Sequence, residues 1–431
     1  MDNQFCLNVS GIPKELSLII ELLKSINSGD VQTSNRELLL DIDWNLFINQ
    51  AAHHRVYPLL YSKLKMMDEH VIPAYVIQSL HQEYKRNTFH MLHLSAEMER
   101  VAKLFTEEQI QLLCLKGPVL AHELYGDISL RTSGDLDVLI PIKKLEQAER
   151  ILASLGYEKD DYIQTVLNDW KWRHHHVTYI HPRKMIKIEI HWRLNPGPGK
   201  EPSFNKLWER KRRSELTSYP VYLLGKEDLF MFLVSHGARH GWSRLRWLLD
   251  IHQMMNQEMD WKKVYQLLNY YHYIPVGGQS IVLSSQLLNT KVTKEMSSLL
   301  VSKRPRELAQ EAIFYLETMI NLHTDPVPED VARYHTRHLF SLMSAQQKFF
   351  FIISFLYPYP EDAETLPLPT KLHFLYFPLR PFLWAWRKSR KDVLRRGENN
   401  ETPLILFKAD TFFCWKKALC EPFGNSVHEF T

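Results

Sequence analysis

Two aspartates, Asp135 and Asp137, lie one residue apart in the stretch SLRTSGDLDVLIPI (129–142), directly ahead of an apolar run. Residues i and i+2 of a strand point to the same side, so the two carboxylates can project together while Leu136 and Val138 turn toward packing. Two hard oxygen donors on one rigid face suit Mg²⁺, which keeps water and substrate phosphates as its other ligands. A D-x-D pair alone is also typical of a solvated strand entrance, so neighbouring residues decide between the two interpretations.

Glu189 is a third candidate ligand. In KIEIHWRL (187–194) it alternates with two isoleucines, which places an acid on one face of an apolar strand. Burying such an acid is costly unless it is paired or binds a cation. His191 follows by two residues and shares this face, where it could contact a phosphate or steady the carboxylate. We therefore predict a divalent metal, Mg²⁺ or Mn²⁺, on Asp135, Asp137 and Glu189.

Two basic residues add a phosphate-binding character to this segment. Lys116 and Gly117 end one apolar run and open a helical pattern, where free backbone N–H groups and the positive helix end favour a phosphate. Gly117 also allows close approach of the backbone. Arg131 precedes the aspartates and supplies a second cation. Acids on strands beside cations at strand ends form a pattern suited to metal-assisted phosphate chemistry.

The histidine run His174-His175-His176 offers a competing interpretation, since imidazoles are common zinc ligands. Three consecutive residues cannot all aim at one ion, and no cysteine lies at a zinc spacing, so zinc is disfavoured. We expect one of His175 and His176 to line the cleft and the other to be exposed.

A second polar cluster lies in SHGARHGWSRLRWLLDIHQMM (235–255). His236, His240 and Arg244 recur at helical spacing on one face, and could close over a bound nucleotide or simply cap, pair and hold an interface. Asp250 lies within LLDI, where an unpaired carboxylate is costly. A buried salt bridge to an arginine is its simplest role, with general base as the alternative.

The elements that position these residues follow from the hydrophobic pattern. Apolar residues recur at three- and four-residue spacing from 14 to about 110, which predicts helices. Between 109 and 195 short apolar runs and alternating segments follow the order β-α-β-α-β-β, with 182–184 as a turn between the last two strands. This order predicts a small mixed sheet with helices packed on one face.

Helical spacing returns from about 222. It continues over 226–255 and recurs over 261–271 and 307–320, while 325–337 is expected to bridge two helices. Prolines beyond 357 predict an extended connector. Further on, Pro378 and Pro381 argue against one continuous amphipathic helix in the aromatic, basic segment 371–391.

These motifs together resemble the uncharacterised nucleotidyltransferase family of the polymerase-β-like superfamily. The resemblance runs from about 40 to 260, with a looser match through the aromatic tail. It is carried by AAHHRVYPLLYSKL (51–64), LKG (115–117), RTSGDLDVLI (131–140), IEIHW (188–192) and SHGARHGWSRLRWLLDI (235–251).

The resemblance implies an α+β fold, with a nucleotidyltransferase mixed-sheet core between helical domains. We predict a helical N-terminal domain, the αβ core, a helical C-terminal domain, and a Pro/aromatic-rich basic tail packed on that last domain. Their expected ranges are 1–108, 109–200, 201–356 and 357–431.

The same resemblance implies Mg²⁺ held by Asp135, Asp137 and Glu189, with Lys116 and Arg131 on the donor phosphates. One departure concerns the phosphate loop. The superfamily usually places a Gly-Ser or Gly-Gly pair closer to the first aspartate, whereas Gly117 precedes Asp135 by 18 residues.

The expected activity is transfer of a group from a nucleoside triphosphate or nucleotide sugar to an acceptor. Members of the family often accompany peptide-modification or polysaccharide genes, so tailoring of a peptide (a lasso peptide, for example) or a saccharide is expected. One alternative is glycosyl transfer to a phosphorylated peptide. Others are a non-catalytic nucleotide- or peptide-binding protein and a membrane-surface scaffold.

The composition of the chain limits its expected partners and cellular location. A formal charge of +4, from 53 basic and 49 acidic residues among 431, is nearly balanced and gives no indication of nucleic-acid binding. Four scattered cysteines and an N-terminus without a signal pattern predict a cytoplasmic protein. No apolar stretch is long enough to span a membrane. The segment 371–391 could still make weak contact with a membrane surface.

Overall fold

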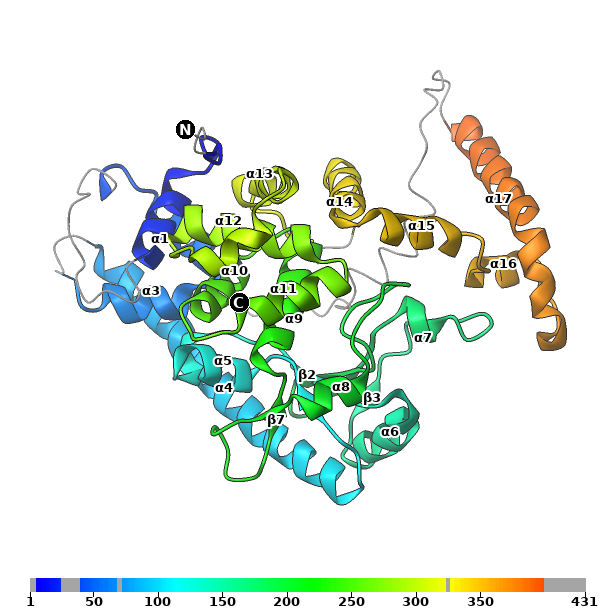
Figure 1. The fold of residues 1–431 in the computed structure, drawn as a ribbon, viewed down its shortest axis with the longest axis horizontal. Helices are drawn as coiled ribbons and strands as arrows, with labels where there is room; N and C mark the ends of the chain where they lie inside the picture. The colour runs from blue at the N-terminus through cyan, green and yellow to red at the C-terminus, as the bar shows by residue number, and fades with distance from the viewer. Residues whose placement is uncertain (1–4, 25–38, 68–71, 164, 323–325, 399–431) are drawn as a thin grey trace.

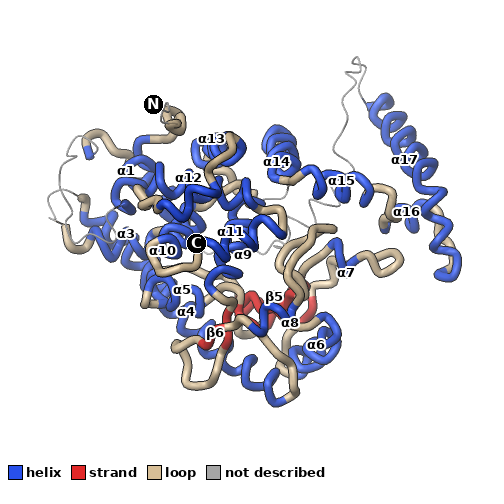
Figure 2. The backbone as a smooth tube through the Cα atoms, viewed as in Figure 1, coloured by secondary structure: helices blue, strands red, loops and turns tan. Residues whose placement is uncertain are grey.

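The computed structural model describes residues 5–24, 39–67, 72–163, 165–322 and 326–398, and a seven-stranded mixed sheet lies at its centre (Figures 1 and 2). The strand order is β3-β4-β5-β2-β1-β7-β6. The strands are β1 (Leu113–Cys114), β2 (Leu136–Leu139), β3 (Glu158–Lys159), β4 (His176–His181), β5 (Ile186–His191), β6 (Arg212–Arg213) and β7 (Tyr222–Leu223). This sheet with its many helices confirms the predicted α+β class.

The three central strands set the register that matters for the site. β2 pairs in parallel with β5, which places Asp137 opposite Glu189. β4 and β5 form an antiparallel hairpin through the predicted turn, and His176 is paired with His191. Because alternate residues of a strand share a face, polar side chains from three strands gather on one side of an otherwise apolar sheet.

Helices from the N-terminal part cover the sheet and extend beyond it (Figure 1). The long α4 packs Met91, Leu94 and Phe105 into one buried cluster with Ile188 and Ile190 of the sheet. This cluster forms the core under the apolar face. The N-terminal helices are α1 (Lys14–Lys24), α2 (Trp44–His53), α3 (Tyr57–Leu64) and α4 (Ala74–Glu107), and α5 (Pro118–Tyr125), α6 (Leu145–Ser154) and α7 (Trp170–Arg173) lie within the sheet segment.

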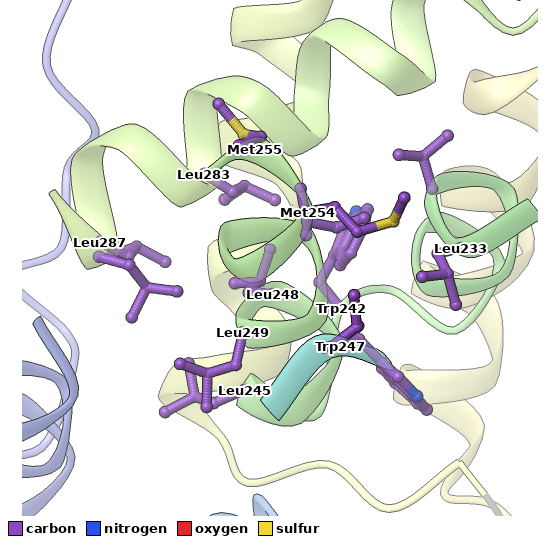
Figure 3. Packing of buried hydrophobic residues seen from close by; sticks show 14 of the residues in the cluster. Leu233, Trp242, Leu245, Trp247, Leu248, Leu249, Met254, Met255, Leu283 and Leu287 are labelled. Atoms are coloured by element: carbon purple, nitrogen blue, oxygen red, sulfur yellow. The ribbon is translucent and has the colours of Figure 1, made fainter. Parts of the chain in front are cut away.

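The C-terminal helices pack against the N-terminal ones. One buried cluster includes Leu16 and Leu60 together with Leu245, Leu249 and Leu283, part of which appears in Figure 3. The division of the chain into domains stays a prediction. The helices of this part are α8 (Phe204–Glu209), α9 (Lys226–Arg239), α10 (Leu245–Met255), α11 (Trp261–Tyr270), α12 (Ile274–Leu288), α13 (Arg304–Glu317), α14 (Glu329–Leu342), α15 (Ala345–Ser354), α16 (Pro360–Thr365) and α17 (Tyr376–Glu398).

The helical pattern over 226–255 is interrupted rather than continuous. α9 ends at Arg239, and Gly241 and Trp242 both adopt positive φ, at 62° and 55°, before α10 begins. A Cβ on Gly237 would lie 2.3 Å from the Trp242 ring, so glycine there lets the buried tryptophan fold back onto α9. Helical periodicity alone does not reveal this turn, because both halves keep their apolar faces toward one core.

Three other expectations for the C-terminal part were wrong at least in part. The segment expected to bridge two helices is itself helical from Glu329, and the connector beyond 357 contains α16. The aromatic segment is helical from Tyr376 on, as part of α17, with Pro381 inside that helix. Pro378 lies in the first turn of that helix, where its missing N–H costs no hydrogen bond. None of the helices in the described ranges is long and apolar enough to cross a membrane.

Cys6 is exposed and Cys114 is buried, and both are free thiols. Cys414 and Cys420 lie outside the described residues, as does the part of the predicted tail beyond 398.

Candidate functional site

The three predicted acids gather at one end of β2 and β5. Asp137 and Glu189 are opposite one another in the parallel register, and Asp135 lies just ahead of β2. Lys187 Nζ is 3.0 Å from Asp135 Oδ2 and 2.9 Å from Glu189 Oε1, which ties both carboxylates to one cation. On the other side, Lys116 Nζ is 3.1 Å from Asp137 Oδ1. Asp137 and Glu189 are buried, whereas Asp135 is partly exposed.

Two histidines complete this cluster. His191 Nε2 lies 3.1 Å from Asp137 Oδ1 and 3.5 Å from Glu189 Oε2, and His176 Nε2 lies 3.8 Å from the same Glu189 oxygen. Ligand atoms of Asp137, Glu189 and His191 all lie within 4.8 Å of one another. Asp137 Oδ2 is buried and accepts no hydrogen bond from any described residue. A buried carboxylate oxygen without a donor, beside a second acid and an imidazole, fits a divalent cation.

The acids are ionised at neutral pH although two of them are buried and Asp135 is partly buried. Burial raises the pKa of Asp135, but Lys187 outweighs it and holds that pKa below its usual range. Burial also raises the pKa of Asp137, but Lys116 outweighs it and holds that pKa below its usual range, assisted by the hydrogen bond from His191. Burial likewise raises the pKa of Glu189, and the neighbouring positive charges, of which Lys187 is the one that persists at neutral pH, bring it well below the usual range. The carboxylates are therefore in the form that binds a metal.

The imidazoles differ in charge. Burial lowers the pKa of His176 to about 3 despite the attraction of Glu189, so this ring is neutral and Lys187 is the lasting cation beside Glu189. Burial also lowers the pKa of His191, but its hydrogen bonds to Asp137 and Glu189 outweigh this and raise it. His191 thus favours the protonated form when no metal is bound, and binding of a metal there would displace its proton.

A second metal-compatible group joins His175, His176 and His191, whose ring nitrogens also lie within 4.8 Å of one another. The expectation that one of His175 and His176 would be exposed was wrong, because both rings are buried at the start of β4. The consecutive run does not itself converge. Instead, two of its rings meet a third from the neighbouring strand.

Gly117 holds the loop that carries Lys116. Its φ of +86° is in the region that side chains rarely adopt, and a Cβ there would lie 3.6 Å from the Asp135 carbonyl oxygen. Pro118 then occupies the first turn of α5, where no N–H is needed. The loop therefore brings Lys116 to Asp137 while leaving the backbone close to the entrance of β2.

A family model described as an uncharacterised nucleotidyltransferase matches residues 41–289, which is more than half of the chain. The chain belongs to this family. No curated protein matches it significantly. Membership indicates a general role in nucleotidyl transfer with a nucleotide as donor, and nucleotidyltransferases generally use a divalent metal.

Among the described residues, Arg131 is paired with Asp250 and not with the acid cluster. Its guanidinium forms a bidentate pair with Asp250, with Nε–Oδ1 and Nη2–Oδ2 distances both of 2.8 Å, and both side chains are buried. Tyr125 donates a further hydrogen bond to the same carboxylate at 3.0 Å. The salt bridge expected for Asp250 is confirmed. The predicted contact between Arg131 and a donor phosphate is not supported by this arrangement.

The three residues expected on one face of a single helix are separated by the break after α9. His236 and His240 lie with ring centroids 4.6 Å apart, and both pack on Trp247. Burial lowers the pKa of His236 well below its usual value, with Lys116 as the next cause, so this ring is neutral and near the predicted phosphate lysine. Arg244 instead points to the N-terminal helices, where it binds the His53 carbonyl.

Sequence reasoning missed Lys187, Arg246 and Arg55. The sequence does indicate Lys187, because this residue is two positions before Glu189 and therefore lies on the same strand face. Arg246 and Arg55 gave no signal on their own, since Arg246 lies in α10 and Arg55 in the turn between α2 and α3, both distant from the acids in sequence.

We predict that replacing Lys187 by Met shifts acid unfolding to higher pH. Asp135 and Glu189 have folded pKa values below their ordinary 3.8 and 4.5, so they stabilise the fold above about pH 5 and this contribution is lost as the pH falls. Without Lys187 both pKa values rise, and unfolding free energy at pH 7 drops by about 2 kcal/mol. Urea unfolding between pH 3 and 7 measures both effects.

The matched control is Lys159→Met, which removes a half-exposed lysine that pairs with Glu149 at the sheet edge. This variant should leave the pH dependence of the unfolding free energy unchanged at acid pH. If the two variants gave the same pH profile, Lys187 would not be what keeps the acids ionised.

Proposed function

We propose that the protein is a metal-dependent transferase that moves a group from a nucleotide donor to an acceptor. The observation that carries this is the convergence of Asp137, Glu189 and His191, with an unpaired buried carboxylate oxygen beside the partly exposed Asp135. The family match supports the nucleotide donor.

Asp135, Asp137 and Glu189 would hold Mg²⁺ or Mn²⁺, and the bound ion would supply positive charge to the phosphates and the attacking oxygen. Lys116 lies beside Asp137 and is placed to contact a donor phosphate. Lys187 keeps two of the acids ionised. We assign Asp137 and Glu189 to the side of the attacking oxygen, where their buried position would exclude bulk water. His236 and His240 would line the donor side near Lys116, whose charge acts after burial to lower the pKa of His236.

The donor is a nucleoside triphosphate or a nucleotide sugar, and the acceptor is a peptide, a saccharide or another small molecule. We favour tailoring of a peptide, such as a lasso peptide, or of a polysaccharide in the cytoplasm. Glycosyl transfer to a phosphorylated peptide is the second candidate, because the same cations would hold the departing nucleoside diphosphate. A purely binding role fits less well, since keeping three clustered, partly buried acids ionised requires several compensating cations.

The proposal is tested by incubating the protein with nucleoside triphosphates and nucleotide sugars, each with Mg²⁺ or Mn²⁺ and a panel of acceptor peptides and saccharides. Mass spectrometry reads the product. A gain equal to a nucleotide identifies nucleotidyl transfer, and a gain equal to a sugar identifies glycosyl transfer. Metal-independent nucleotide binding without any product would contradict the proposed transferase.

We also propose weak contact of α17 with membrane surfaces. Phe382, Trp384 and Trp386 are 73%, 42% and 57% exposed on this helix, beside Lys388. Aromatic residues next to basic ones favour the interface of anionic bilayers. Arg380 and Arg387 have a different role, since both pair with the buried Asp362 and hold α16 against α17.

Replacing Phe382, Trp384 and Trp386 together by Ser should weaken co-sedimentation with vesicles containing anionic lipid by about tenfold, because the apolar contact area is lost. Phe89→Ser removes a similarly exposed aromatic from α4 and serves as the control. Equal sedimentation of the triple variant and the wild-type protein would argue that α17 does not bind the vesicles.

A further inference from the structure

Two signature segments that are far apart in sequence meet in space. The junction between α2 and α3 (53–56) packs on the start of α10: the Arg246 amide donates to the His54 carbonyl at 3.3 Å, and the Leu245 amide donates to His54 Nδ1 at 3.4 Å. The Arg244 guanidinium donates to the His53 carbonyl. This contact brings three arginines together, which we call the arginine cluster (Arg55, Arg244 and Arg246).

The arginine cluster borders the loop that leads into β2. Arg246 Nη1 donates to the Thr132 carbonyl at 2.5 Å and approaches the Thr132 hydroxyl at 2.9 Å. Arg55 Nη1 lies 4.0 Å from where a Cβ on Gly134 would be. The next residue of the loop is Asp135, the exposed member of the acid cluster. An anion held by these guanidinium groups would therefore lie beside the predicted metal site.

Among the residues that the structure describes, no carboxylate is in contact with the arginine cluster. In the described ranges, the ion pairs engage none of its three members, and the side-chain partners of Arg244 and Arg246 are carbonyls, an amide and a hydroxyl. Asp135 and Asp250 attract Arg246 from a distance, but they already pair with Lys187 and Arg131. Arg246 Nε is buried without a hydrogen-bond partner.

Arg55 consequently repels both Arg244 and Arg246. Burial, followed by the charge of Arg55, lowers the pKa of Arg244 to about 10. Burial, Arg131 and Arg55 lower the pKa of Arg246 well below its ordinary value. Burial also lowers the pKa of the adjacent His53 to about 4, so that ring adds no charge. Positive charge gathered in a partly buried site without a counter-ion is costly, and a bound anion removes this cost.

We propose that the arginine cluster binds a phosphate-bearing group of a substrate. Planar guanidinium donors match phosphate oxygens in pairs, which a lysine cannot do. This inference rests on the proposed function. The phosphate belongs either to the donor or to a phosphorylated acceptor, and it reaches the metal site past Gly134. Lys116 approaches Asp137 from the α5 side, so the acid cluster lies between two separate sources of positive charge.

The test uses the full-length protein, EDTA and inorganic pyrophosphate as the probe, measured by calorimetry without divalent metal. Arg55→Gln and the double variant Arg55→Gln/Arg246→Gln should bind pyrophosphate progressively more weakly, about tenfold for each arginine. Arg333→Gln removes an exposed arginine of α14 and is the matched control. The Arg55 side chain makes none of the described hydrogen bonds, so thermal unfolding of Arg55→Gln should be unchanged or shifted upward.

Asp137→Asn separates this inference from the proposed function, because it removes a metal ligand but should keep metal-free pyrophosphate binding. Competition by a nucleoside triphosphate or by a phosphoserine peptide then shows which source of phosphate uses the arginine cluster. Pyrophosphate binding that is absent in the wild-type protein, or equal in Arg55→Gln/Arg246→Gln and Arg333→Gln, would overturn the inference even if transfer activity were present.

Discussion

The Asp137→Asn variant should lose transfer activity, with kcat/KM lower by about 10³-fold or more, since a metal contributes several kcal/mol to stabilising charge in the transition state. Asp137 is the acid that contacts both Lys116 and His191 and retains a buried oxygen without a partner. Asparagine keeps the shape but removes the charge that binds the metal. Activity is read by product mass, and metal affinity by Mn²⁺ titration with paramagnetic resonance.

Asp161→Asn is the control, because its carboxylate is 85% exposed in the same segment and outside the cluster. Both variants should show the same helical content by circular dichroism. Asp137→Asn also leaves Lys116 without its partner, so the drop in activity must be accompanied by a drop in Mn²⁺ affinity. Wild-type Mn²⁺ binding in Asp137→Asn would mean that the metal, if required, is held elsewhere.

The acids were predictable because strand alternation reveals side-chain direction. Asp137 and Glu189 each interrupt an apolar strand pattern, with Asp135 two residues ahead of Asp137, and a costly buried charge suggests a partner. The pairing of β2 with β5 was not predictable in this way. These strands are separated in the chain by α6, β3, α7 and β4, and their register depends on the packing of the whole sheet.

The positions of the helical residues near the site were harder to predict from the sequence. Periodicity shows which face of a helix is apolar, but it does not show where the chain turns back. The turn at Gly241–Trp242 moved Arg244 off the face of His236 and toward the α2–α3 junction. Arg131 similarly looked like a phosphate ligand from its place ahead of the aspartates, whereas a distant carboxylate, Asp250, engages it.

Asp250→Leu should lower the free energy of unfolding by about 3–5 kcal/mol, because it leaves the Arg131 guanidinium buried without its counter-ion. Both side chains are 1% exposed, so water cannot replace the lost carboxylate. Tyr125 also loses its acceptor. Urea unfolding followed by circular dichroism measures the change. Glu329→Ala, which breaks the exposed pair with Arg333, should cost less than about 1 kcal/mol and provides the comparison.

Adding Arg131→Met to Asp250→Leu should recover much of the lost stability, since replacing both members of a buried pair by apolar residues removes the unpaired charge. This double variant also decides what Arg131 does. If the arginine only positions α10 against the loop before β2, the refolded variant should keep KM for the donor close to the wild-type value. A KM at least about tenfold higher, with stability restored, would instead assign Arg131 to phosphate binding, because a structural residue affects donor affinity only through the fold.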